Sequence, residues 1–170
     1  MSMKKVATAQ AALGYRSKGL FSSLRTDWAT PRQLFDILDR EFRFTLDACA
    51  SVDNLPRPGL EYFDPALTDA LLRKWVPLEE GAVWCNPPYG RQVGKWVEKA
   101  FRESKSNTVV MLLPARTDTR WWHEYCMRGE ILFLCGRLCF DDNPRKRAPF
   151  PSAIVVFSCG GAQSKLKAES

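Results

Sequence analysis

The alternation of strand-like and helix-like stretches constrains the fold of this chain more than any other feature. Apolar residues alternate with polar ones, or run together, at 42–47, 82–85 and 108–113, as in buried strands. Between these runs, apolar residues recur every three to four positions, most regularly at 93–101. Strands separated by helices favour a sheet whose strands are largely parallel and whose faces are both covered. We therefore expect an α/β fold: one domain with a mostly parallel sheet, helices on both faces and antiparallel terminal strands.

The first helix has a clear starting signal. Thr30, Pro31 and Gln33 have the spacing of a capping box, with threonine as N-cap and proline at the first helical position. Leu34 and Leu38 then repeat at helical spacing, so one face of this helix should pack inward. The sequence predicts a helix that starts at Pro31 and is capped by the Thr30 side chain.

The remaining elements are expected from the same periodicities and from turn residues between them. They are a brief strand at 61–63, a short helix at 67–75, helices at 93–101 and 117–126, and strands at 130–134, 138–140 and 153–158.

Length and composition indicate one folded unit. In a chain of 170 residues, 45% hydrophobic and 26% charged, we expect a flexible basic arm at 1–25, a folded domain at 26–159 and a polar tail at 160–170. No apolar run approaches the ~18 residues of a membrane span, and residues 1–5 carry no signal-peptide pattern, so a cytoplasmic location is expected. A net charge of +6 fits a polyanionic partner without requiring one.

Cysteine and histidine usage argues against a metal site. The six cysteines include no C-x-x-C pair, and the chain has a single histidine, His123. We expect reduced thiols, most of them buried, and a structural role for His123 beside Trp122.

A rigid corner, Asn86-Pro87-Pro88-Tyr89, follows the apolar run at 82–85. The prolines fix the backbone and donate no hydrogen bond, so carbonyl groups here are held in set directions. Asn86 adds an amide oxygen and Tyr89 adds a flat ring, a set suited to an amino group on a heteroaromatic base. A plain proline-rich turn is the alternative. Residues 47–51 also follow a strand, so both segments should face one crevice at the carboxyl ends of the strands.

Several motifs in order give the chain a family resemblance. They lie at 27–31, 44–51, 84–90, 112–119, 136–140 and 148–152, and only the Pro-Pro-Tyr corner is specific by itself. The chain resembles the phage-type (Dam-like) DNA N6-adenine methyltransferases, small members of the S-adenosylmethionine-dependent Rossmann-like superfamily. The resemblance covers about 27–157 and implies a Rossmann-like methyltransferase domain, S-adenosylmethionine as methyl donor and DNA as partner.

The resemblance implies that the corner residues Asn86, Pro87, Pro88 and Tyr89 are catalytic. The Asn86 side-chain oxygen and the Pro87 carbonyl would accept the two hydrogens of the adenine amino group, directing its lone pair at the methyl group. Tyr89 would stack on the base after it is flipped from the duplex, which needs the ring and not the hydroxyl. A core or turn aromatic is the alternative for Tyr89.

The cofactor residues are less marked, because no glycine lies between Asp47 and Pro58 to form the usual glycine-rich loop. Small side chains after Asp47 allow a similar close approach, and Asp47 would hold the methionine ammonium or lie at the base of the loop, with a turn cap as the alternative. Asp69 would accept from the adenine of the cofactor, or lie on a solvated helix face. The predicted cofactor-binding residues are Thr30, Pro31, Asp47, Ala48, Cys49, Ala50, Asp69 and Asn86.

A basic run at 145–147 is the first candidate for contact with DNA, and a solvated loop is its alternative. The predicted nucleic-acid-binding residues are Arg116, Arg120, Arg137, Arg145, Lys146 and Arg147.

The sequence predicts transfer of a methyl group to adenine N6 in DNA. Two rival readings remain open: transfer to another planar amino group (cytosine N4, RNA adenine or a protein glutamine), or a non-catalytic nucleic-acid-binding module on the same fold. Too little chain separates Asp47 from Asn86 for a large recognition domain, so short or relaxed target specificity is expected. We also expect a monomer or weak dimer that binds no metal and no membrane, located in the host cytoplasm if a phage encodes it.

Overall fold

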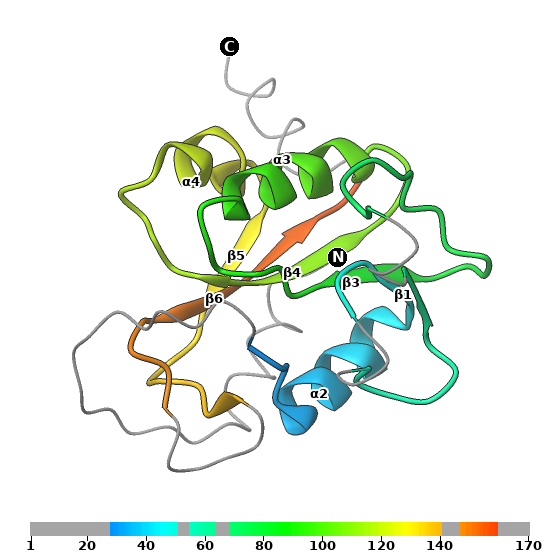
Figure 1. Cartoon of the computed structure of the whole chain (residues 1–170), viewed down its shortest axis with the longest axis horizontal. Coiled ribbons are helices and arrows are strands. Elements are labelled where there is room, and N and C mark those ends of the chain that lie inside the picture. Colours follow the sequence, from blue (N-terminus) through cyan, green and yellow to red (C-terminus); the bar gives the residue numbers. More distant parts are fainter. Residues whose placement is uncertain (1–27, 51–54, 64–68, 141–146, 160–170) are drawn as a thin grey trace, which may run out of the picture.

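A six-stranded mixed sheet organises the molecule (Figure 1). The computed structural model describes residues 28–50, 55–63, 69–140 and 147–159. The strands are β1 (Phe44–Asp47), β2 (Glu61–Tyr62), β3 (Ala82–Cys85), β4 (Val109–Pro114), β5 (Glu130–Phe133) and β6 (Ser152–Phe157). In the order β2-β1-β3-β4-β6-β5, the first four are parallel, and β6 pairs antiparallel with both β4 and β5. The expected α/β sheet with antiparallel terminal strands is therefore confirmed.

Helices cover both faces of this sheet. Helix α2 (Arg32–Phe42) lies on one face, and α3 (Val93–Glu103) and α4 (Arg120–Glu124) lie on the other (Figure 1). A single 3-10 turn, η1 (Cys126–Arg128), follows α4. None of the helices in the described part of the chain is long and apolar enough to cross a membrane.

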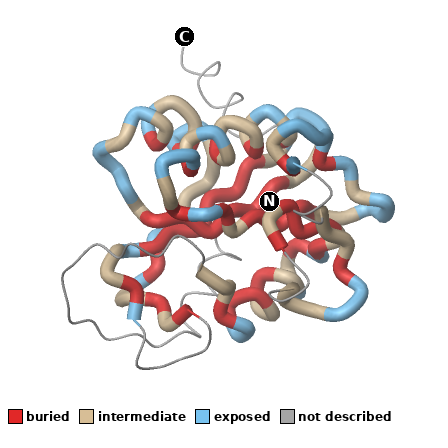
Figure 2. The backbone as a smooth tube through the Cα atoms, in the orientation of Figure 1, coloured by how far each residue is buried: buried red, intermediate tan, exposed pale blue. Residues whose placement is uncertain are grey.

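The central strand β4 separates two hydrophobic cores. Its alternate side chains Val110 and Leu112 pack in the core under α2, whereas Val109, Met111 and Leu113 pack in the core under α3. All six residues of β4 are buried, and Figure 2 shows the buried strands running between the two helical layers. A strand buried on both faces reads as a continuous apolar run, which is why this element was clear from the sequence.

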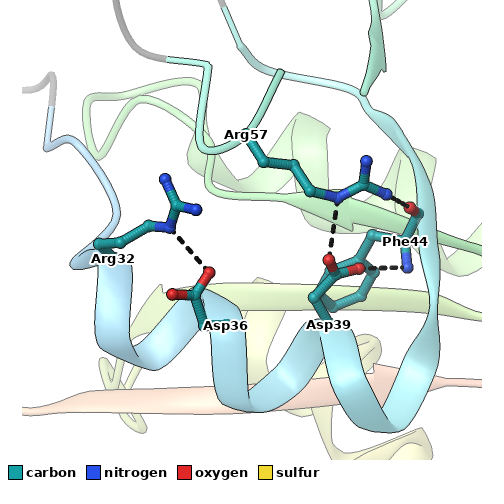
Figure 3. Close-up of polar contacts among 5 residues, drawn as sticks. All are labelled: Arg32, Asp36, Asp39, Phe44 and Arg57. Atoms are coloured by element: carbon teal, nitrogen blue, oxygen red, sulfur yellow. Dashed lines mark hydrogen bonds and ion pairs between the residues drawn. The ribbon is translucent and has the colours of Figure 1, made fainter. Parts of the chain in front are cut away.

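A polar clamp fixes the junction between α2 and β1 (Figure 3). The Asp39 carboxylate accepts from the Phe44 N–H at 2.8 Å and from Arg57 Nε at 2.9 Å, and Arg57 Nη2 also donates to the Phe44 carbonyl. Arg43, at the turn, has a φ of 54° in the left-handed region. These contacts tie Arg57, which lies between β1 and β2, to the end of α2 and to the first residue of β1.

The predicted capping box is wrong. Helix α2 begins at Arg32, with Pro31 in the N-cap position and no side-chain cap. The Thr30 hydroxyl instead accepts a hydrogen bond from the Asn86 side chain at 3.1 Å. The same oxygen was therefore available to two partners, and a contact distant in sequence is the one that forms.

Two other expected elements differ from the structure. Residues 69–81 form turns and bends, not part of a helix, and 64–68 lie outside the described residues. Buried Trp75 is held there by long-range bonds, its N–H to the Glu103 carboxylate and its carbonyl to the Asn107 amide. The strand expected at 138–140 is a single bridge between Cys139 and Arg147.

The cysteines are all free thiols, as expected. Cys85 and Cys126 are buried, but Cys135 and Cys159 are exposed, so burial was predicted for too many of them. The expected arm at 1–25 and tail at 160–170 lie outside the described residues.

Candidate active site

The two predicted strand-end segments lie side by side. β1 and β3 are parallel neighbours, and Asp47, the last residue of β1, is in register with Trp84. One residue on, the Ala48 N–H donates to the Trp84 carbonyl at 2.9 Å. The chain leaves both strands at the same edge of the sheet, and the crevice that the two segments would share stays a prediction.

The Asn86 side chain at this edge is held by three hydrogen bonds. Its Nδ2 donates to the Trp28 carbonyl at 2.5 Å and to Thr30 Oγ1 at 3.1 Å. Its Oδ1 accepts from the Tyr89 hydroxyl at 2.7 Å. Because a backbone carbonyl can only accept, the amide nitrogen must face Trp28, and the amide oxygen must face Tyr89.

Tyr89 is a core residue in this conformation, only 4% exposed. Its ring meets Phe140 and Phe150 edge-on, with centroids 6.1 and 5.5 Å away. Burial raises the pKa of the Tyr89 hydroxyl well above its usual value, so it stays protonated. Its single hydrogen has two acceptors within reach, Asn86 Oδ1 and the Leu112 carbonyl at 3.1 Å.

The stacking role of Tyr89 stays a prediction, and the structure adds a condition to it. A base can lie on this ring only if the ring or its aromatic neighbours move, because the ring is almost fully enclosed. Trp28 packs on the same two phenylalanines, at 5.0 Å from Phe140 and 5.4 Å from Phe150. The four rings join the segment before α2, the corner, and the chain between β5 and β6.

Asp47 is a buried carboxylate at the base of the adjacent turn. Its Oδ1 accepts from the Cys49 N–H at 2.9 Å, and the Ala50 backbone also donates to the carboxylate. Burial raises the pKa of Asp47 to about 7, although these two hydrogen bonds act to lower it. The turn-cap and loop-base readings are both consistent with this geometry. A ligand cation bound beside this buried acid would favour its ionised form.

Small side chains surround this turn, as expected. Ala48 and Ala50 are buried, and Cys49 Sγ lies 3.5 Å from Cys85 Sγ. Burial raises the pKa of both thiols, so they act as neutral packing groups between the two strand ends.

The other predicted cofactor residues divide into two groups. Thr30 and Pro31 are brought to the corner, because the Thr30 hydroxyl bonds Asn86. Asp69 lies in an exposed turn, where its carboxylate accepts from the Leu71 N–H at 2.9 Å. The geometry thus supports Thr30 and Pro31 as neighbours of Asn86 and gives Asp69 a local role in its own turn.

The predicted DNA-binding residues are not one cluster. Arg116, exposed after β4, lies nearest the corner, with Nη2 3.5 Å from the Tyr89 carbonyl. Arg120 is on α4 and forms an ion pair with Glu124 at 2.6 Å. Arg137 and Arg147 flank residues that pack in the α2 layer, on the other face of the sheet from α4. Arg145 and Lys146 lie outside the described residues.

Sequence reasoning missed the backbone carbonyl of Trp28 as a partner of Asn86. A carbonyl group has no residue-type signature, and 58 positions separate these residues. The only available signal was the motif at 27–31, which contains both Trp28 and Thr30.

Comparison with known proteins identifies the family. A sequence model described as DNA N-6-adenine-methyltransferase (Dam) matches residues 18–157. The chain belongs to this family. It is also 35% identical, over 142 residues, to a protein of Escherichia phage T1 named DNA N-6-adenine-methyltransferase. That alignment covers 81% of this chain and 57% of the phage T1 protein, so the chain spans little more than half of its relative's length.

Proposed function

We propose that this chain is a DNA adenine-N6 methyltransferase that uses S-adenosylmethionine and has a Rossmann-like catalytic domain. Family membership and the printed name of the phage T1 relative support the reaction. The observation that carries it is the fixed amide of Asn86, held at the carboxyl end of β3 beside a buried carboxylate at the end of β1.

Asn86 and Pro87 would prepare the amino group for attack. The adenine amino nitrogen is a poor nucleophile because its lone pair is delocalised into the ring. Accepting its two hydrogens, at Asn86 Oδ1 and the Pro87 carbonyl, draws the nitrogen towards tetrahedral geometry and frees the lone pair. These two acceptors would hold the amino nitrogen with its lone pair facing the methyl donor, and one N–H proton would leave to solvent after transfer.

The Tyr89 hydroxyl and the substrate amino group can share the Asn86 side-chain oxygen, because an amide oxygen accepts through two lone pairs. The hydroxyl faces Asn86 Oδ1 here, and the Leu112 carbonyl offers a second acceptor within 3.1 Å. The hydroxyl would therefore help to orient Asn86 Oδ1 while the second lone pair accepts from the substrate, and a turn towards Leu112 would not leave a buried donor unpaired. The enclosing rings would open as the flipped base enters.

The residues present fit the methionine end of S-adenosylmethionine, which supplies an activated methyl group when bound. Asp47 is a buried carboxylate with a pKa near 7, which a bound ammonium would lower. The small residues 48–50 leave room for close approach. We propose Asp47, Ala48, Cys49 and Ala50 as the cofactor side of the site, with Thr30 and Pro31 at the corner, where the Thr30 hydroxyl bonds Asn86.

Purified protein, labelled S-adenosylmethionine and either unmethylated genomic DNA or total RNA test this reaction. We expect label in N6-methyldeoxyadenosine from DNA. Label found only in RNA or in the protein itself would show that the acceptor is not DNA adenine. If the protein binds the cofactor but transfers no label, a non-catalytic module is favoured.

Asp47→Asn is expected to separate folding from cofactor binding. Between pH ~4 and ~7 the folded protein keeps a proton on Asp47 that the unfolded chain releases, so wild-type stability falls as pH rises through this window. Asparagine keeps the acceptor for Cys49 without a charge. The variant should therefore melt above wild type at pH 8, with the difference shrinking towards pH 5. Its affinity for S-adenosylmethionine should fall at least about tenfold, since the ammonium loses its counter-charge.

Thermal melts across this pH range, with calorimetric titration of the cofactor, measure both effects. A parallel pH profile for wild type and variant would show that Asp47 is ionised throughout. Unchanged cofactor affinity in the folded variant would place the ammonium elsewhere.

Arg116→Ala is expected to weaken DNA binding without affecting the cofactor. Arg116 is an exposed cation beside the corner, with Nη2 3.5 Å from the Tyr89 carbonyl. A contact between its guanidinium and a DNA phosphate would release about one counterion, so the slope of the salt dependence should fall by about one unit in the variant. Arg102→Ala is the matched control, because it removes the same charge from the far end of α3. Fluorescence titration of duplex DNA at several salt concentrations measures both. Equal losses in the two variants would show a general charge effect, and no role for Arg116.

A further inference from the structure

A donor-and-acceptor clamp sets which way the Asn86 amide points. Its Nδ2 carries two hydrogens, and each has its own acceptor, the Trp28 carbonyl and Thr30 Oγ1. Both acceptors come from the segment just before α2, not from the corner itself. With both hydrogens occupied, the amide oxygen is directed away from this segment and towards Tyr89.

The clamp is itself anchored by packing. Trp28 lies against Phe140 and Phe150, the same rings that enclose Tyr89. Pro31, directly after the segment, is buried, and its carbonyl accepts the first helical bond of α2 from Phe35 at 3.1 Å. The segment is therefore fixed on both sides, so its two acceptors occupy defined positions.

We propose that Thr30 is a positioning residue that, with the Trp28 carbonyl, holds the Asn86 amide in its reactive orientation and makes asparagine, not aspartate, obligatory at position 86. This rests on the proposed role of Asn86 Oδ1 as acceptor of the substrate amino group. An aspartate has the same shape but no hydrogens to donate. It would place a carboxylate oxygen against the Trp28 carbonyl, losing that bond and adding repulsion between two acceptors, although the Thr30 hydroxyl could turn and donate to it.

The Thr30 hydroxyl has a spare donor after accepting from Asn86. Threonine accepts through a lone pair, so its own hydrogen remains available to a further acceptor. A cofactor role for Thr30 predicts lost cofactor affinity on removal of the hydroxyl. A positioning role predicts a slower reaction at saturating cofactor. The two roles are therefore distinguishable by measurement.

Thr30→Val and Thr30→Ser form the matched pair for this test. Valine keeps the volume and branching of threonine but removes the oxygen, whereas serine keeps the oxygen and removes a methyl group. Thr30→Val should slow single-turnover methyl transfer to unmethylated genomic DNA roughly five- to tenfold, the effect of one lost hydrogen bond, with cofactor affinity within about twofold of wild type. Thr30→Ser should remain within about twofold of wild type. Asn86→Asp should lose on the order of 100-fold, because the bond to the Trp28 carbonyl is replaced by a repulsive contact.

NMR of the Asn86 side-chain amide tests these hydrogen bonds directly, without a methyl-transfer reaction. The Asn86 NH₂ signals, assigned by their absence from Asn86→Ala, should exchange slowly with water in wild type and in Thr30→Ser. In Thr30→Val one of the two should exchange faster.

Each failure has its own signature. Unprotected Asn86 NH₂ signals in wild type, a wild-type rate in Thr30→Val, or equal losses in the valine and serine variants would overturn the clamp. So would an Asn86→Asp protein of wild-type activity. A Thr30→Val protein with weaker cofactor binding and a normal rate at saturation would make Thr30 a cofactor ligand instead. A wild-type protein that folds, shows the protected amide and yet methylates no DNA would refute the proposed function and leave the clamp standing.

Discussion

Asn86→Ala is expected to lower methyl transfer to DNA by at least about 100-fold, the scale seen when one preorganised hydrogen-bonding group is removed from an active site. The substitution deletes the oxygen that would accept from the substrate, together with the nitrogen that fixes its direction. Cofactor affinity should change little by comparison. Stability should fall by about 1–2 kcal/mol, because Thr30, Trp28 and Tyr89 lose a partner.

Asn107→Ala is the matched control. Asn107 is another half-buried asparagine, and its Nδ2 donates to the Trp75 carbonyl at 2.7 Å. Asn107 lies just before the start of β4, and therefore at the edge of the sheet opposite to Asn86. It should lose similar stability and keep its activity. If the loss of activity in both variants followed the decrease in their melting temperatures, Asn86 would have a structural role alone.

Tyr89→Ala is expected to cost about 3–5 kcal/mol of stability, the range for truncating a large buried aromatic, and to abolish most activity. The ring is 4% exposed and packs on Phe140 and Phe150, so its removal leaves a cavity inside the aromatic group that also holds Trp28. Denaturant unfolding and a methyl-transfer assay, run below the midpoint of the variant, measure the two effects separately. A variant that unfolds at the wild-type midpoint would show that the ring is not packed in solution.

Tyr89→Phe isolates the hydroxyl. A stacking role alone predicts nearly full activity, and this was the expectation from the sequence. The structure changes it, because the hydroxyl lies 2.7 Å from Asn86 Oδ1. We now expect a loss of roughly fivefold in rate and about 1 kcal/mol in stability. Tyr125→Phe, which removes a hydroxyl from the opposite core near Phe101, should leave the rate unchanged.

Periodicity was sufficient to predict most of the sheet and the amphipathic helix α3. Strand β4 is buried on both faces, and α3 turns Val93, Val97 and Ala100 inward, so local pattern and tertiary packing agree at these elements. Prediction failed where a side chain had two possible partners. The spacing around Thr30 suits a helix cap, and nothing in that spacing reveals Asn86, 56 positions away.

The candidate site was predictable in its residues but not in its packing. The corner sequence specifies an amide, two prolines and a ring, and the parallel neighbours β1 and β3 bring the corner beside Asp47. Burial of Tyr89 depends on Phe140 and Phe150, which lie far along the chain and have no fixed spacing from the corner. The raised pKa of Asp47 likewise follows from the depth of β1 in the sheet, which residue type alone does not give.

The most direct test of the proposed function is nucleoside mass spectrometry of DNA from cells that lack their own adenine methyltransferase. One culture expresses this chain and another expresses Asn86→Ala at equal soluble levels. We predict N6-methyldeoxyadenosine in DNA from the first culture and only background in the second. N4-methyldeoxycytidine in its place, or unmodified DNA despite folded, cofactor-binding wild-type protein, would contradict the assignment.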